Sequence, residues 1–162
     1  MNRLLLSIVL ALAASQCLAA GVWNGSSSSM SVTQSAAPPD YPILMAAWVN
    51  PANVTASHTV LSIDNNGGGS ADALALVLSG TTGGDPVGAE AVVSGSAATS
   101  SAAAGFTANG WQLCVAYFES ATARRSLRST GGDEVTWGSE NTTSKTLGNL
   151  THIRVGGGWG GT

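Results

Sequence analysis

Apolar and polar residues alternate with a period of two along much of the chain after Ala20, and short apolar runs are interrupted by Gly, Asn, Ser and Thr. No apolar pattern with the helical period is sustained over three turns. Because successive side chains of a strand point to opposite faces, this pattern predicts an all-β chain. The clearest cases are 73–79, where three leucines share one face, and 87–94.

The stretch from Trp111 to Phe118 is apolar at both odd and even positions. This predicts a strand that is buried on both faces and therefore needs a packed layer on each side. Asn109-Gly110 before it and Glu119-Ser120 after it provide turn residues. We therefore expect a two-sheet antiparallel sandwich organised around this strand.

Similar apolar runs predict further strands, and Gly- and Asn-rich segments predict turns between them. The expected strands are 43–49, 59–63, 124–129, 134–137 and 152–155. Asn24-Gly25 predicts a hairpin turn before Met30. The Ser/Ala/Thr tract at 94–104 favours an edge strand or a loop over a helix.

The composition indicates one domain with few charged residues. Charged residues make up 9% of the 162 residues, against about 25% in an average protein, whereas 44% are hydrophobic and can form a core. A net charge of -3 and a single lysine, Lys145, leave no basic surface for nucleic acid. We interpret the one cationic cluster, Arg124, Arg125 and Arg128, as a solvated strand edge.

The N-terminus has the pattern of a secretory signal peptide, with a basic start, an apolar run at 4–14 and small residues up to Ala20. We predict a signal peptide at 1–19 and one domain at 20–162, with membrane contact only through the signal. Lipidation at Cys17 is the alternative interpretation. Cys114 is then the remaining cysteine, interpreted as a small buried hydrophobic residue.

Three stretches resemble the laminin-G-like domains of the concanavalin A-like lectin and glucanase jelly-roll superfamily, found in secreted and phage proteins. They are 41–49 (YPILMAAWV), 109–118 (NGWQLCVAYF) and 153–157 (IRVGG). The resemblance implies a jelly roll. Gln112 and Leu113 replace a histidine pair that is common in the family and mainly structural.

That family continues past the late strand with a last strand that returns beside the first, whereas this sequence ends at Thr162. The chain is therefore expected either to be a fragment or to leave a sheet edge that another chain, or a rearranged N-terminus, covers. Self-association through such an edge is one expected contact.

Candidate binding residues are of two kinds. Asp64 and Asn66 offer oxygen ligands for calcium on a Gly-rich turn, where the resemblance also implies a calcium ligand, and Asp85 or Asp133 is expected near them after folding. Tryptophans beside polar or Gly-rich stretches are candidates for stacking on sugar rings, whereas Trp48 and Trp111 are expected in the core. The candidate stacking residues are Trp23, Trp137 and Trp159.

We therefore expect a secreted, non-catalytic module that binds an extracellular glycan or protein surface, with calcium as an aid. A structural or virion-surface protein that assembles through a sheet edge is the alternative. A glycoside hydrolase is the weakest alternative, because no two carboxylates lie at i, i+2 on one strand, as the retaining mechanism would favour. Two histidines, His58 and His152, and the absence of a Gly-x-Ser-x-Gly elbow argue against a serine triad.

Overall fold

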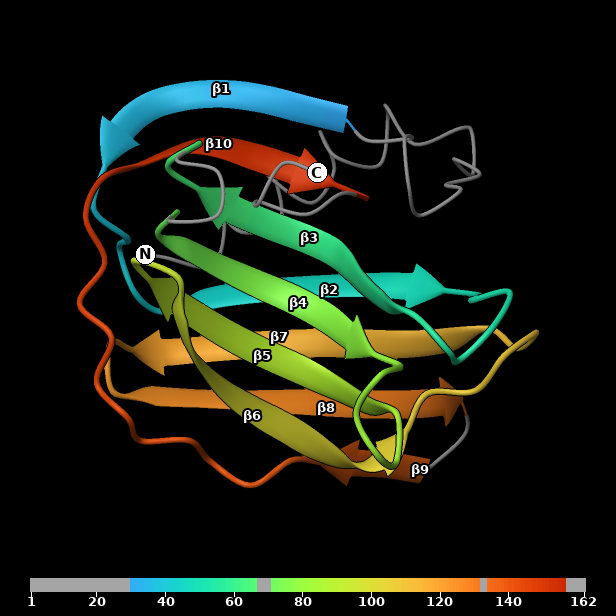
Figure 1. Cartoon of the computed structure of the whole chain (residues 1–162). Coiled ribbons are helices and arrows are strands. Elements are labelled where there is room, and N and C mark those ends of the chain that lie inside the picture. The colour runs from blue at the N-terminus through green and yellow to red at the C-terminus, as the bar shows by residue number, and fades with distance from the viewer. Residues whose placement is uncertain (1–29, 67–70, 132–133, 157–162) are drawn as a thin grey trace, which may run out of the picture.

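The computed structural model describes residues 30–66, 71–131 and 134–156, and within them the chain forms ten strands in two antiparallel sheets (Figure 1). One sheet has six strands in the order β1-β10-β3-β4-β5-β6, and the other has four in the order β2-β7-β8-β9. The strands are β1 Met30–Ala37, β2 Ile43–Val49, β3 Ser57–Asp64, β4 Ala73–Ser79, β5 Pro86–Val93, β6 Ser96–Gly105, β7 Gln112–Ser120, β8 Ala123–Gly131, β9 Glu134–Trp137 and β10 Leu150–Val155. The expected all-β, two-sheet antiparallel sandwich is confirmed.

The predicted strands are found with small changes at their ends, and β2 and β4 have the predicted bounds. The Ser/Ala/Thr tract forms β6, an edge strand of the six-stranded sheet. A two-residue turn, Ser94-Gly95, joins β5 to β6, and both residues have positive φ (49° and 80°), the geometry that matches the twist of a hairpin. The predicted signal peptide and the turn at Asn24-Gly25 lie outside the described residues.

The core lies between the two sheets. Leu74, Leu76 and Leu78 of β4 share one cluster with buried side chains from the even positions of β7, namely Cys114, Ala116 and Phe118. The prediction that β7 is buried on both faces is wrong. Of the odd positions Val115 is buried, but Leu113 and Tyr117 are only half-buried, and Trp111 lies outside the strand and is 58% exposed.

The predicted late strand is not at a sheet edge. β10 pairs with β3 on one side, where Ile153 lies opposite Ile63, and with β1 on the other, where Ile153 lies opposite Val32. The N-terminal strand therefore covers the edge that the resemblance left open. Within the described part of the chain, no helix is long and apolar enough to cross a membrane.

A segment after β9 joins the two sheets on one side of the sandwich. Gly138 pairs with Ala102 of β6, and its N–H donates to the Ser126 carbonyl of β8. A Cβ atom at Gly138 would lie 2.3 Å from the Ser101 carbonyl oxygen, so the close approach requires glycine. Ser100 Oγ strengthens the junction by donating to the Ser139 carbonyl at 2.7 Å.

We expect Gly138→Ala to destabilise the protein by about 2 kcal/mol, because the added methyl group must push two backbone segments apart. Urea unfolding monitored by tryptophan fluorescence measures this change. Gly83→Ala is the matched control, because a Cβ there meets nothing within 4 Å. Equal stability of the two variants would show that the junction between the sheets does not constrain the fold.

Candidate ligand-binding site

Every strand of the four-stranded sheet places apolar side chains on its outer face, although β8 also places Arg125 and Ser129 there. By strand alternation, this surface, here called the tryptophan face, consists of Leu44, Trp48, Trp111, Leu113, Val115, Tyr117, Leu127, Val135 and Trp137. Its most exposed members are Leu44 (65%), Trp111 (58%), Trp48 (55%), Val135 (51%) and Trp137 (50%). The expectation that Trp48 and Trp111 lie in the core is wrong, whereas Trp137 is exposed as its polar surroundings suggested.

Strand register places the three exposed tryptophans at two ends of this face. Trp48 lies opposite Leu113, so Trp111, two residues earlier, is its diagonal neighbour at about 7–8 Å between Cα atoms. Trp137 lies opposite Leu127 on the far edge of the sheet, three strand spacings from β2, or about 14 Å. The buried Val115 and Leu127 and the half-buried Leu113 form the floor between the two ends.

A polar pair lies beside the apolar floor. Arg125 of β8 faces outward opposite Tyr117, and its Nε donates to Glu140 Oε2 at 2.9 Å. Both side chains are partly exposed, so this ion pair contributes at most about 1 kcal/mol to stability. It adds hydrogen-bonding groups to the rim of the tryptophan face.

The other members of the arginine cluster are buried, which corrects the interpretation of the cluster as a solvated edge. Arg124 is 1% exposed, and its guanidinium donates to Asn141 Oδ1 at 2.8 Å and to the carbonyls of Ala121 and Thr143. Burial lowers the pKa of Arg124. Arg128 Nε donates to Gln112 Oε1 at 2.8 Å, so Gln112 has a structural role.

Of the predicted calcium ligands, Asp64 and Asn66 lie together, but both accept from Arg154, and Asp85 lies apart from them. Asp64 is fully buried and accepts from Arg154 Nε at 2.8 Å and from the Asn66 backbone N–H at 2.8 Å. Asn66 Oδ1 also accepts from Arg154. Asp85 follows the opposite end of β4, about 20 Å from Asp64 along a seven-residue strand. In the described residues no group of three His, Cys, Asp or Glu side chains could hold a metal ion, and Asp133 lies outside them.

Two other residues with chemical potential, Cys114 and Asn141, lie in surroundings that indicate a structural role. Burial raises the pKa of Cys114 to about 12, so this thiol stays protonated at neutral pH and is a poor nucleophile. Asn141, which begins an Asn-x-Thr sequon, is held by Arg124 and donates to the Thr99 carbonyl. Trp23 and Trp159 lie outside the described residues, so their predicted role in ligand binding stays a prediction.

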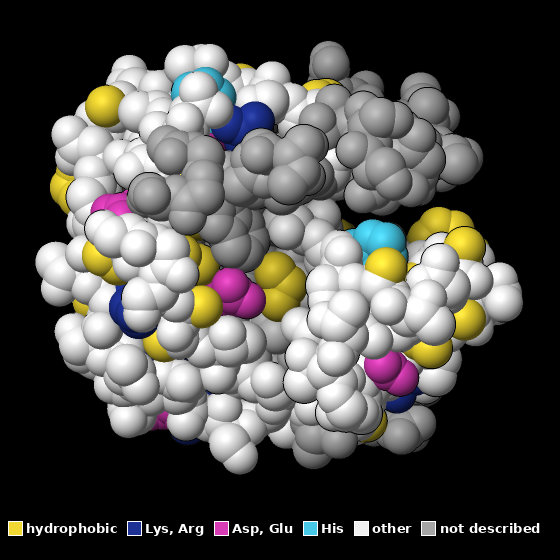
Figure 2. Space-filling view, viewed as in Figure 1, with side chains coloured by type: hydrophobic (Ala, Val, Ile, Leu, Met, Phe, Trp, Pro, Cys, Tyr) yellow, Lys and Arg dark blue, Asp and Glu magenta, His cyan; other side chains and the backbone are white. Residues whose placement is uncertain are grey.

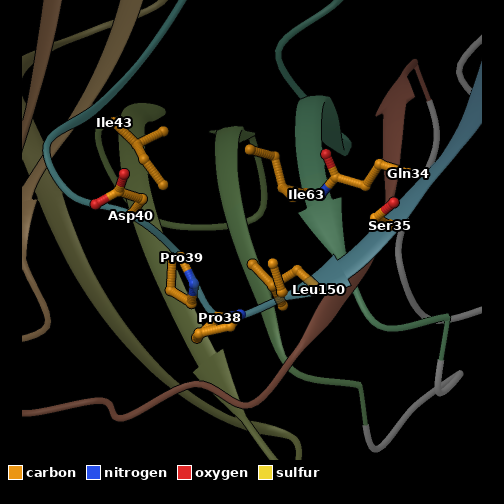
Figure 3. Close-up of a pocket in the computed structure, with 9 residues that line it drawn as sticks. Gln34, Ser35, Pro38, Pro39, Asp40, Ile43, Ile63 and Leu150 are labelled. Carbon is orange, nitrogen blue, oxygen red and sulfur yellow. The ribbon is translucent and has the colours of Figure 1, made fainter.

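A small cavity of about 210 Å³ lies where the connection from β1 to β2 passes from the six-stranded to the four-stranded sheet (Figure 3). Pro38 and Pro39 lie beside Leu150, and the carboxylate of Asp40 lies on the side near Ile43, away from Gln34 and Ser35. Its polar groups are therefore spread around the rim and do not converge on one point. This arrangement is less suited to a specific ligand than the tryptophan face.

Comparison with known proteins gives no family: no protein-family model matches the chain, and no curated protein has a similar sequence.

We expect Asp64→Asn to lower stability by about 3 kcal/mol, because it leaves Arg154 without its carboxylate partner. Urea unfolding at pH 7 tests this, once with calcium and once with chelator. Because Arg154 already neutralises Asp64, the loss should be the same in both conditions. Asp85→Asn is the control and should have little effect, since asparagine also tolerates the positive φ of 46° found there. A calcium-dependent gain in the unsubstituted protein that Asp64→Asn removes would contradict this account.

Proposed function

We propose that this protein is a non-catalytic binding module that holds a polymeric glycan against the tryptophan face. The observation that carries the proposal is the exposure of Trp48, Trp111 and Trp137 on one outer sheet face. The C–H face of a sugar ring packs well against an indole ring, while neighbouring polar groups such as Arg125 and Glu140 orient hydroxyls. The predicted signal peptide at 1–19 supports action outside the cell.

The size of the tryptophan face favours a glycan over a stable protein partner. Four strands about 4.8 Å apart and about seven residues long cover about 400 Å². A stable protein interface buries about 800 Å² on each partner. The face is therefore too small for such an interface, although it falls within the range of functional apolar patches.

The placement of the rings also favours a chain over a single sugar. The Trp48 and Trp111 end is separated from Trp137 by about 14 Å, which exceeds the width of one sugar ring. A ligand that contacts both ends must therefore be an oligosaccharide. The likeness to laminin-G-like jelly rolls is consistent with this proposal but does not carry it.

We expect Trp48→Ala and Trp137→Ala each to weaken glycan binding at least about tenfold, which corresponds to about 1.4 kcal/mol. A panel of cellulose, chitin, xylan and β-1,3-glucan, measured by pull-down, identifies the ligand, and calorimetry with the matching oligosaccharide gives the affinity. Val32→Ala, which truncates a side chain that is 55% exposed on the other sheet, is the control. Binding that survives both tryptophan substitutions would place the glycan site elsewhere, and no binding to any glycan would reject the proposal.

A second candidate function, a structural or virion-surface protein that assembles with copies of itself, is favoured by a different apolar surface. Met30, Val32 and Ile153 are 53%, 55% and 41% exposed on the side of β1 and β10 that continues the core. Sedimentation equilibrium distinguishes the two functions. A defined oligomer that Val32→Asp dissociates, with no glycan bound, would support assembly, and a monomer would exclude it.

A further inference from the structure

A second hollow lies on the opposite side of the sandwich, on the outer face of the six-stranded sheet. It measures about 250 Å³ and is lined by Ser57, His58, Thr59, Val77, Ser79 and Glu90. Figure 2 shows this side of the molecule, where most of the surface is uncharged and acidic and basic side chains are scattered. The tryptophan face is on the far side of this view.

Strand pairing explains why the hollow is shallow and why Glu90 is its acidic group. Glu90 lies between Ala75 of β4 and Thr99 of β6. Gly88, two residues before it, is covered by the side chains of Val77 and Thr99, because a Cβ atom there would lie 2.8 Å from Val77 Cγ2 and 3.0 Å from Thr99 Cγ2. A carboxylate therefore stands among small side chains, with hydroxyl groups of β3 and β4 at one end.

Glu90 has no cationic partner among the described residues. The sequence contains six Lys and Arg residues, of which Arg3 lies outside the described part. The other five are bonded elsewhere, Arg124 to Asn141, Arg125 to Glu140, Arg128 to Gln112, Lys145 to Ser96 and Arg154 to Asp64. Burial raises the pKa of Glu90, and a hydrogen bond from the Thr99 side chain lowers it by a smaller amount. The ionised carboxylate is thus desolvated without compensation from a protein cation.

We propose that this hollow binds the primary ammonium group of an amino sugar, with Glu90 as the counter-ion. An ammonium group has three N–H donors. The Glu90 carboxylate accepts from it, and the Thr59 and Ser79 hydroxyls are further acceptors at the same hollow. Ser57, which bonds to Thr81 Oγ1 at 2.9 Å, adds a hydroxyl for the sugar's own hydroxyls. Val77, which also lines the hollow, offers an apolar surface on which a sugar ring can lie.

This inference is independent of the tryptophan face, because the two sites lie on different sheets. The test uses a trimer of glucosamine and, as its matched partner, the fully acetylated trimer, which lacks the ammonium charge. Calorimetry on the Trp48→Ala, Trp137→Ala double variant removes stacking on the other sheet from the measurement. We expect the glucosamine trimer to bind at least about tenfold more tightly than the acetylated trimer. Equal affinities would overturn the proposal.

Substitution at the carboxylate locates the site. Glu90→Gln keeps the shape of the side chain and removes its charge, so it should abolish the preference for the glucosamine trimer. Glu119→Gln, which removes an exposed carboxylate of β7, is the matched control and should retain it. Loss of the preference in both variants would show that net charge alone attracts the ligand, which would overturn a site at Glu90.

The pH dependence and stability of Glu90→Gln separate a ligand site from a structural role. β4 and β6 carry no ionisable side chain, and β3 contributes His58 and Asp64. The pKa of Glu90 is higher in the folded than in the unfolded protein, so its ionisation destabilises the folded protein at pH values above that pKa. At low pH Glu90 is protonated in both the folded and the unfolded protein and does not change stability. Glu90→Gln should therefore raise the melting temperature at pH 7 but not at acid pH, and it should weaken binding of the glucosamine trimer.

The affinity of the unsubstituted protein for the glucosamine trimer should fall as acid protonates Glu90. A variant that is less stable at pH 7 would mean that Glu90 has a structural role.

A lysine analogue distinguishes the source of the ammonium group. N-acetyl-lysine amide carries the same charge without ring hydroxyls. Weaker binding of this analogue than of monomeric glucosamine supports an amino sugar. Equal or tighter binding would overturn that assignment in favour of a lysine side chain.

Discussion

One apolar layer between the sheets holds this fold together, and the positions of both outer faces follow from it. Leu74, Leu76 and Leu78 occupy one side of β4 and share a cluster with the even side chains of β7. Each leucine contributes about 1.5–3 kcal/mol through burial. Within the described residues Cys114 is a free thiol and two ion pairs are formed, so burial is the main source of stability. Strand alternation then directs Trp48 and Glu90 away from that layer, toward opposite sides of the molecule.

The interior beside β8 is held by a different kind of interaction. Arg124 is buried and bonded to neutral acceptors, which stabilise a guanidinium less than a carboxylate does. Its Nε and the Tyr41 hydroxyl are buried without a partner in the described structure, which costs about 1–3 kcal/mol for each group. In return Arg124 fixes Asn141, and the segment that follows Trp137 is held against both sheets. One edge of the tryptophan face therefore depends on this buried arginine.

Alternation in the sequence was sufficient to predict β4, because a leucine at every second position specifies a core face, whereas β2 was predicted from its continuous apolar run. It could not place Trp48 and Trp111. The sequence pattern of a strand that is apolar on both faces is the same whether its second face meets a protein layer or solvent. The burial of Arg124 and Arg128 could have been predicted from the sequence, because residues i and i+4 on a strand share a face and Arg125 must point the other way. The separation of Asp64 and Asp85 also follows once three consecutive strands are taken as antiparallel neighbours.

The energy available at the tryptophan face argues for a polymeric ligand. Three tryptophans that are each about half exposed leave about 300 Å² of aromatic surface in water, worth about 8 kcal/mol if all of it were covered. A sugar covers one face of each ring, so about half of that free energy is gained on binding. Association costs at least about 4 kcal/mol in lost motion, and a single contact is therefore weak. Tight binding then requires many copies of the ligand on one chain or surface, where the second contact forms at a high effective concentration.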